Sequence, residues 1–212
     1  MESKAFNLSL KNNPAVTVKV IPGHFTTSSS HLTHFIDVGS LKSNAVVARE
    51  AARELAVPYS YNKYIETIVC MERTEVIGAY LAEELMQKGM SSVIDNGIFV
   101  VTPINNNLGN LSFQSSTVKC VLNKNILLLV TSVSSGHTLN GAIDCITYYG
   151  GRLTGISALF LALKDTQDLE INSLFTSDEI PGYMKYGSRD CDMCRAGQKL
   201  DALISSEGYT KL

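Results

Sequence analysis

A short run of small and hydroxyl-bearing residues has the composition of a phosphate-binding loop. It follows an apolar segment of strand length, 126–130, and it precedes apolar side chains at helical spacing over 139–146. The residues of the run are Ser134, Ser135, Gly136, His137 and Thr138. Free backbone N–H groups and the positive end of the helix dipole attract an anion at such a turn. Because ligands collect where the strands of an α/β sheet end, we predict a phosphate site here rather than a Ser or Thr helix cap alone.

This segment resembles the signature of the type I phosphoribosyltransferases. Their signature is an apolar strand, two acidic residues, two further residues and then Thr-Thr-Gly-x-Thr. In that family the loop holds the 5-phosphate of phosphoribosyl pyrophosphate (PRPP), and the two acids meet the ribose hydroxyls. When the signature is aligned with this sequence without a gap, its phosphate loop corresponds to residues 134–138 and its acidic pair to Val130 and Thr131. The phosphate half of the motif is kept, and the ribose half is altered.

A second segment, 23–39, resembles the N-terminal hood of the orotate phosphoribosyltransferases. The hood pattern runs Gly-x-Phe, an extended Leu-x-Ser-Gly, then Ser-Pro-Tyr and an apolar strand. The residues that match it directly are Gly23, Phe25, Ser29 and Gly39. We expect Phe25 either to cover a flat base, with Thr26 beside it, or to fill the core beneath the turn.

A third segment fits between these two. Residues 64–70 indicate a buried strand and 74–88 a helix, and in the family the turn between them holds pyrophosphate through backbone amides. At this turn Thr74 is expected to cap the helix, and Glu72 lies where negative charge is favourable. Arg73 can contact a phosphate or remain a solvated charge. The resemblance also implies Mg²⁺, bound together with PRPP.

One expected group of charges is absent from the sequence. The orotate enzymes carry lysines and an arginine on a flexible catalytic loop, whereas 102–118 contains no Lys, Arg or His. Losing one preorganised electrostatic group costs on the order of 10²–10³ in rate. Mg²⁺, Arg73 or a partner subunit supplies the missing charge, or the substrate differs.

The composition is that of one globular domain of 212 residues with a net charge of −2. No block of Lys and Arg appears, so we expect a small phosphosugar or nucleotide as partner, with no nucleic acid and no membrane. Residues 1–5 lack the pattern of a secretory signal, which favours a cytoplasmic protein. The resemblance implies a homodimer.

Apolar strands alternate with amphipathic helices along most of the chain, which indicates an α/β fold: a mostly parallel sheet with helices on both faces. Residues 43–55 and 74–88 predict helices, and 152–163 suits a strand or a buried helix. We expect an N-terminal hood over 1–40, a phosphoribosyltransferase-like core over 41–165 and a C-terminal extension over 166–212 that packs on the same domain and carries a C-x-x-C pair.

The five cysteines are too few and too scattered for a disulfide framework, so we expect reduced thiols. Cys191 and Cys194 form a C-x-x-C pair that could hold half of a structural zinc site. The other ligands would be scattered thiols or histidines, or the same pair in a second subunit; the alternative is free thiols. We expect His24, His31 and His34 to be hood or surface residues rather than ligands.

The sequence is compatible with two functions. The phosphate loop and the hood favour an enzyme that transfers a phosphoribosyl group between PRPP and an orotate-like base. The altered ribose position and the uncharged loop favour a catalytically impaired sensor that keeps the fold and binds PRPP or a nucleotide.

Overall fold

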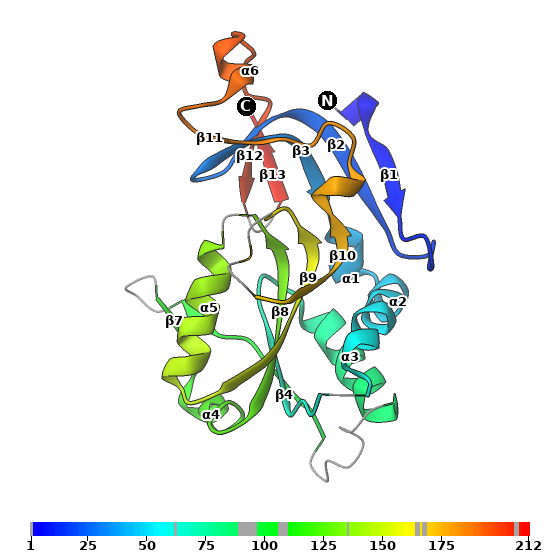
Figure 1. Ribbon diagram of the computed structural model, residues 1–212, viewed down its shortest axis with the longest axis vertical. Coiled ribbons are helices and arrows are strands. Elements are labelled where there is room, and N and C mark those ends of the chain that lie inside the picture. Colours follow the sequence, from blue (N-terminus) through cyan, green and yellow to red (C-terminus); the bar gives the residue numbers. More distant parts are fainter. Residues whose placement is uncertain are drawn as a thin grey trace.

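The protein contains two sheets, a parallel core sheet below a largely antiparallel hood sheet (Figure 1). The computed structural model describes residues 2–212 except 62, 89–96, 106–109, 135, 164–165, 167–168 and 206–207. The strands of the core sheet, in order across it, are β10 (Ile171–Thr176), β9 (Arg152–Leu161), β8 (Asn125–Val133), β4 (Thr67–Cys70) and β5 (Phe99–Val101). Every neighbouring pair among them is parallel.

Helices cover both faces of the core sheet, as the alternation of strands and helices predicted (Figure 1). The central strand β8 shows why, because its successive side chains point to opposite faces. Leu127 and Leu129 pack with α2 (Ala45–Ala56) and α3 (Glu75–Lys88) in one buried cluster. Leu128 and Val130 pack with α5 (His137–Tyr148) in another. A strand buried on both faces needs the continuous apolar run that 126–130 provides.

The remaining short elements lie around these two sheets. They are α1 (Gly39–Ser43), α4 (Ser115–Val118), the 3₁₀ turns η1 (Glu2–Lys4), η2 (Val57–Tyr59) and η4 (Ser177–Glu179), and the antiparallel pair β6 (Ile104–Asn105) and β7 (Leu111–Ser112). The β6–β7 pair lies in the predicted flexible loop, whose residues 106–109 are outside the described part of the chain. No helix among the described residues is long and apolar enough to cross a membrane.

The hood sheet is built from both ends of the chain, which the sequence did not predict. Its N-terminal strands are β1 (Phe6–Ser9), β2 (Thr17–Thr26) and β3 (Ser30–Asp37); its C-terminal strands are β11 (Lys185–Gly187), β12 (Ala202–Ser205) and β13 (Gly208–Lys211). In Figure 1 the red C-terminal strands lie beside the blue N-terminal ones. The expected boundary at residue 165 also differs from the structure, since β10 belongs to the core sheet. The C-terminal part therefore contributes strands to both sheets.

A buried tyrosine at the end of η2, the turn that follows α2, joins this segment to the core sheet. The Tyr59 hydroxyl donates to the carbonyl oxygen of Ile156 (2.9 Å), lies 3.0 Å from the Ser157 hydroxyl and accepts from the Asn172 amide (2.8 Å). The Tyr59 side chain is 1% exposed, so water does not reach its hydroxyl and cannot take over these hydrogen bonds.

We expect Tyr59→Phe to lower the free energy of unfolding by about 1–3 kcal/mol, because the buried Ile156 carbonyl and Ser157 hydroxyl and the half-buried Asn172 amide lose a partner. Urea denaturation measures the change. Tyr61→Phe is the matched control, since Tyr61 is 79% exposed and should leave stability unchanged. Equal stabilities for the two variants would contradict this role of Tyr59.

Candidate functional site

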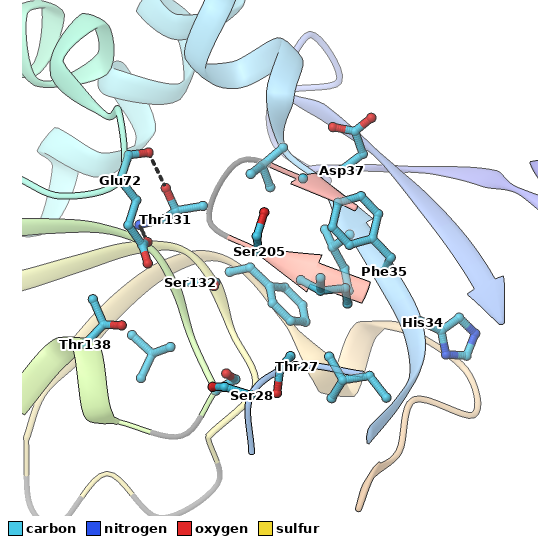
Figure 2. Close-up of a pocket in the computed structure, with 18 of the residues that line it drawn as sticks. Thr27, Ser28, His34, Phe35, Asp37, Glu72, Thr131, Ser132, Thr138 and Ser205 are labelled. Atoms are coloured by element: carbon cyan, nitrogen blue, oxygen red, sulfur yellow. Dashed lines mark hydrogen bonds between the residues drawn. The ribbon is translucent and has the colours of Figure 1, made fainter. Parts of the chain in front are cut away.

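A cavity of about 530 Å³ lies between the hood sheet and the ends of the core strands. Figure 2 shows side chains from both sheets pointing into it. The core contributes Glu72, Thr131, Ser132, Ser134, Gly136 and Thr138, and the hood contributes Thr27, Ser28, His34, Phe35, Asp37 and Ser205. Lys42 reaches it from α1. The loops after two parallel strands thus meet one face of the hood, the usual place for a ligand in an α/β sheet.

The predicted phosphate loop lies at the edge of this cavity. Gly136 caps α5 in the left-handed conformation, with φ 79° and ψ −13°, so the helix begins at a glycine rather than at a Ser or Thr cap. Ser134, Gly136 and Thr138 line the cavity, whereas His137 lines a neighbouring one of about 1040 Å³ that Thr138 also borders. Ser135 is outside the described residues. The described part of the loop therefore presents a helix N-terminus and two hydroxyls to one space.

The turn after β4 adopts a backbone that non-glycine residues rarely take. Glu72 and Arg73 have φ values of 53° and 65°, both in the left-handed region. Contacts across the strand ends hold this turn. The Thr131 N–H donates to Glu72 Oε2 (3.1 Å), the Thr131 hydroxyl donates to the Glu72 carbonyl (3.2 Å), and Lys42 Nζ donates to the same carbonyl (3.1 Å). Strain of this kind persists only where the surroundings determine it, and it is typical of functional sites.

The turn also places a carboxyl group where the family motif expects acids. Figure 2 shows Glu72 beside Thr131 at the end of β8. Burial raises the pKa of Glu72, while the N–H groups of Thr131 and Ser132 and the charge of Lys42 act in the opposite direction. These donors occupy only part of the Glu72 carboxyl group, and its remaining acceptor sites can receive a hydrogen bond from a ligand hydroxyl.

The two predicted ribose positions have different environments. Thr131 lines the cavity, but Val130 is buried in the cluster beneath α5. An acid at Val130 would be placed in an apolar core, at a cost of several kcal/mol. The ungapped alignment therefore brings only one of its two positions to the cavity, and Glu72 supplies the carboxyl group from the neighbouring loop.

The prediction that Phe25 covers the cavity is wrong. Its ring is fully buried inside the hood, 6.0 Å from the ring of Phe35 and 6.4 Å from that of Tyr209. Phe35 lines the cavity instead. Thr26 does not line it, and its hydroxyl donates to the Thr27 carbonyl (3.0 Å).

The other residues of the predicted pyrophosphate turn point elsewhere. Thr74 is buried, and its hydroxyl donates to the carbonyl oxygens of Met71 (2.9 Å) and Leu129 (3.3 Å), which joins the turn to β8. Arg73 is exposed and is not among the described residues that line the cavity. Thr74 nevertheless holds the expected N-cap position, because it directly precedes α3 and its carbonyl accepts from the Gly78 N–H (2.8 Å). The phosphate contact of Arg73 stays a prediction.

Several residues in and beside the cavity were not identified from the sequence. Lys42 lies at the end of a five-residue helix, too short to show a pattern. His34 stacks on Tyr183, with ring centroids 6.1 Å apart, and burial lowers its pKa. Lys185 of β11 donates to the Ser134 carbonyl (2.6 Å), which joins the hood to the phosphate loop.

Cys191 and Cys194 lie away from the cavity, beside His24 and His31.

Comparison with known proteins agrees with this architecture. No family model matches the sequence, and no curated protein matches it. Among solved structures, Leishmania donovani UMP synthase superposes with a TM-score of 0.55 at 16% identity, over 76% of this chain and 34% of that one. Mycobacterium tuberculosis orotate phosphoribosyltransferase, in complex with Fe(III) dicitrate, gives 0.52 at 11% identity, over 76% and 91%. Giardia lamblia APRTase, complexed with 9-deazaadenine, gives 0.52 at 17%, over 75% and 93%.

At these identities the likeness concerns the fold. The chain has the α/β fold of the type I phosphoribosyltransferases, shared by adenine and orotate enzymes. This chain spans about a third of the UMP synthase structure that it resembles.

We expect Gly136→Val to weaken the binding of inorganic phosphate at least tenfold. A Cβ atom at this position would meet no clash, since its nearest neighbours are 3.9 Å away and beyond. The effect arises from the left-handed backbone instead, because a β-branched residue adopts this conformation only at a cost of about 1–2 kcal/mol, and the loop is expected to shift to avoid it. Calorimetric titration with phosphate measures it. Gly182→Val is the matched control, because Gly182 has φ 75° and open space around it. Unchanged phosphate affinity in Gly136→Val would contradict a phosphate site on this loop.

Proposed function

We propose that this protein binds PRPP in the cavity below the hood and transfers its phosphoribosyl group to or from an orotate-like nucleobase. The observation that supports the proposal most strongly is the Glu72–Thr131 contact beside the loop at 134–138. It combines, in one cavity, a helix N-terminus suited to a phosphate and a carboxyl group suited to sugar hydroxyls.

Each part of the substrate has a matching part of the cavity. The 5-phosphate accepts hydrogen bonds from the N–H groups at the start of α5 and from the hydroxyls of Ser134 and Thr138. The ribose hydroxyls donate to Glu72. The pyrophosphate lies along the left-handed turn at 72–73, because successive backbone N–H groups in such a turn can bind an anion, and the charge of Lys42 lies beside it.

Mg²⁺ fits this arrangement as a partner of the pyrophosphate. Mg²⁺ is commonly held by one or two carboxylates together with substrate phosphates. Among the described residues that line the cavity, Glu72 and Asp37 are the carboxylates that can provide this contact. When bound, the ion neutralises charge on the leaving pyrophosphate, which the uncharged strands β6 and β7 cannot do.

The hood provides the environment for a base. Phe35 offers an aromatic surface, and Thr27, Ser28 and Ser205 offer hydroxyls for the polar edge of a heterocycle. The orotate class follows from the resemblance of residues 23–39 to the orotate hood. Adenine enzymes share the fold, so adenine is the comparison base.

A non-catalytic sensor of PRPP or a nucleotide is the second candidate. It is favoured by the buried Val130 and by the lack of Lys, Arg and His in β6 and β7. Such a protein would bind the sugar phosphate without releasing pyrophosphate.

A turnover assay separates these candidates. The protein is incubated with PRPP, Mg²⁺ and either orotate or adenine, and pyrophosphate release is followed while calorimetry measures PRPP binding. We expect binding, and release that depends on orotate. Binding without release under either base would favour the sensor. Absence of PRPP binding would contradict both.

We expect Glu72→Gln to weaken the binding of ribose 5-phosphate about tenfold to hundredfold and to leave the affinity for inorganic phosphate unchanged. A charge-assisted hydrogen bond is worth about 1.5–3 kcal/mol, and only the sugar contacts Glu72. Because burial raises the pKa of Glu72, the difference between the two proteins should shrink as the pH falls through that raised pKa and the carboxylate is protonated. Paired calorimetric titrations measure both effects.

Glu75→Gln is the matched control for this substitution. Glu75 is exposed at the start of α3, where it accepts from the Thr102 hydroxyl (2.8 Å), and it does not line the cavity. An equal loss of affinity in both variants, or none in Glu72→Gln, would show that the Glu72 carboxylate does not recognise the sugar.

A further inference from the structure

Four side chains that can bind a metal ion meet on the hood, away from the cavity. They are His24 of β2, His31 of β3, and Cys191 and Cys194 at either end of the first turn of α6 (Asp192–Arg195). One ligand atom from each lies within 4.8 Å of all the others. Figure 1 shows α6 beyond the hood sheet, on the side opposite the core sheet. None of the four lines the cavity below the hood.

The spacing of these atoms suits a tetrahedral ion. His24 Nε2 lies 3.1 Å from His31 Nδ1, 3.4 Å from Cys191 Sγ and 3.6 Å from Cys194 Sγ. Cys194 Sγ lies 3.3 Å from His31 Nδ1. Zinc bonds of about 2.0–2.1 Å to nitrogen and about 2.3 Å to sulfur place tetrahedral ligands roughly 3.3–3.8 Å apart. The observed separations are close to these values.

The surroundings orient one ligand in advance. His24 Nδ1 lies 3.0 Å from the Gln198 carbonyl oxygen, which can only accept, so Nδ1 carries the hydrogen. Nε2 then presents its lone pair to the other three ligand atoms. The backbone N–H of His24 donates to Asp201 Oδ2 (2.8 Å), so a second hydrogen bond holds His24 against the segment that contains Gln198. A histidine held through its other ring nitrogen is the usual arrangement at a metal site.

Burial and charge also favour an ion. His24 is fully buried, Cys191 is 1% exposed and His31 is 8% exposed. Two thiolates and two neutral imidazoles around a divalent cation give no net charge, which removes the cost of burying an isolated charge. Cys194 is exposed and leaves a path for the ion to enter.

We propose that His24, His31, Cys191 and Cys194 bind one zinc ion. Two sulfur and two nitrogen ligands in a tetrahedron favour zinc over harder cations, and four protein ligands leave no open position, so its role is structural. The expectation that His24 and His31 are not ligands is replaced by this proposal. This proposal does not rest on the function proposed above.

The zinc site has a consequence for the hood. The ligands join β2 and β3 to a segment 167 residues away in sequence. After that segment the chain enters β12, which pairs with β2 at Phe25 and Thr26 and carries Ser205 into the cavity. Zinc therefore holds the C-terminal strands against the N-terminal ones, and removing it should loosen one wall of the cavity.

Metal analysis of the full chain tests the proposal. Protein purified under reducing conditions without chelator should contain about one zinc ion per chain, and Cys191→Ser with Cys194→Ser, or His31→Ala, should contain less than about a tenth of that. Cys120→Ala is the matched control, because Cys120 is a buried thiol outside the cluster and should leave the zinc content unchanged. Chelation should lower the melting temperature of the unaltered protein and of Cys120→Ala only.

Cobalt replaces zinc in a second measurement, which needs no variant. The unaltered chain loaded with Co²⁺ should show the visible absorption of tetrahedral coordination and a thiolate-to-metal charge-transfer band. Zinc contents that are equal in the cluster variants and the control would overturn the proposal. So would a folded, reduced protein that binds neither ion, or a Cys191–Cys194 disulfide found by mass spectrometry after purification with added zinc.

Discussion

The arrangement of this protein depends on one constraint: β4, β8 and β9 are buried and parallel, so their chains must leave the sheet at the same edge. The polar backbone groups that emerge there need partners. At the ends of β4 and β8 the partners are each other, through the bonds between Glu72 and Thr131. The same bonds hold a left-handed turn and direct a carboxyl group toward the cavity, so the contact that satisfies the backbone also creates the polar wall of the site.

The hood completes the site by contacts that neither end of the chain can make alone. β3 carries Phe35 and Asp37 to the cavity, and β12 carries Ser205. Lys185 of β11 connects this sheet to the Ser134 carbonyl, directly at the phosphate loop. A ligand placed between the two sheets would therefore contact segments from the whole length of the chain, and its affinity would depend on how firmly the C-terminal strands are held.

The sequence predicted the core well because its signals are local. Apolar runs followed by amphipathic spacing identified β8 and α5, and Gly136 marked the turn between them. Other features depend on contacts between distant segments. Phe25 was the ring expected at the cavity, but Phe35 of β3 lines it, and the pairing of β2 with β3 includes a register shift between Pro22 and Phe25 that no local pattern in the sequence indicates. Glu72 reaches β8 only because two residues adopt a left-handed backbone, and no local pattern pairs His24 with Cys191.

The central claim is that one cavity holds the phosphate and the sugar of a phosphoribosyl group. A crystal structure of the protein with ribose 5-phosphate tests it most directly. We expect the phosphate to lie against the backbone N–H groups at the start of α5, with the furanose hydroxyls within hydrogen-bond distance of the Glu72 carboxylate. Ribose 5-phosphate bound elsewhere, or bound at this loop with its sugar directed away from Glu72, would contradict the account.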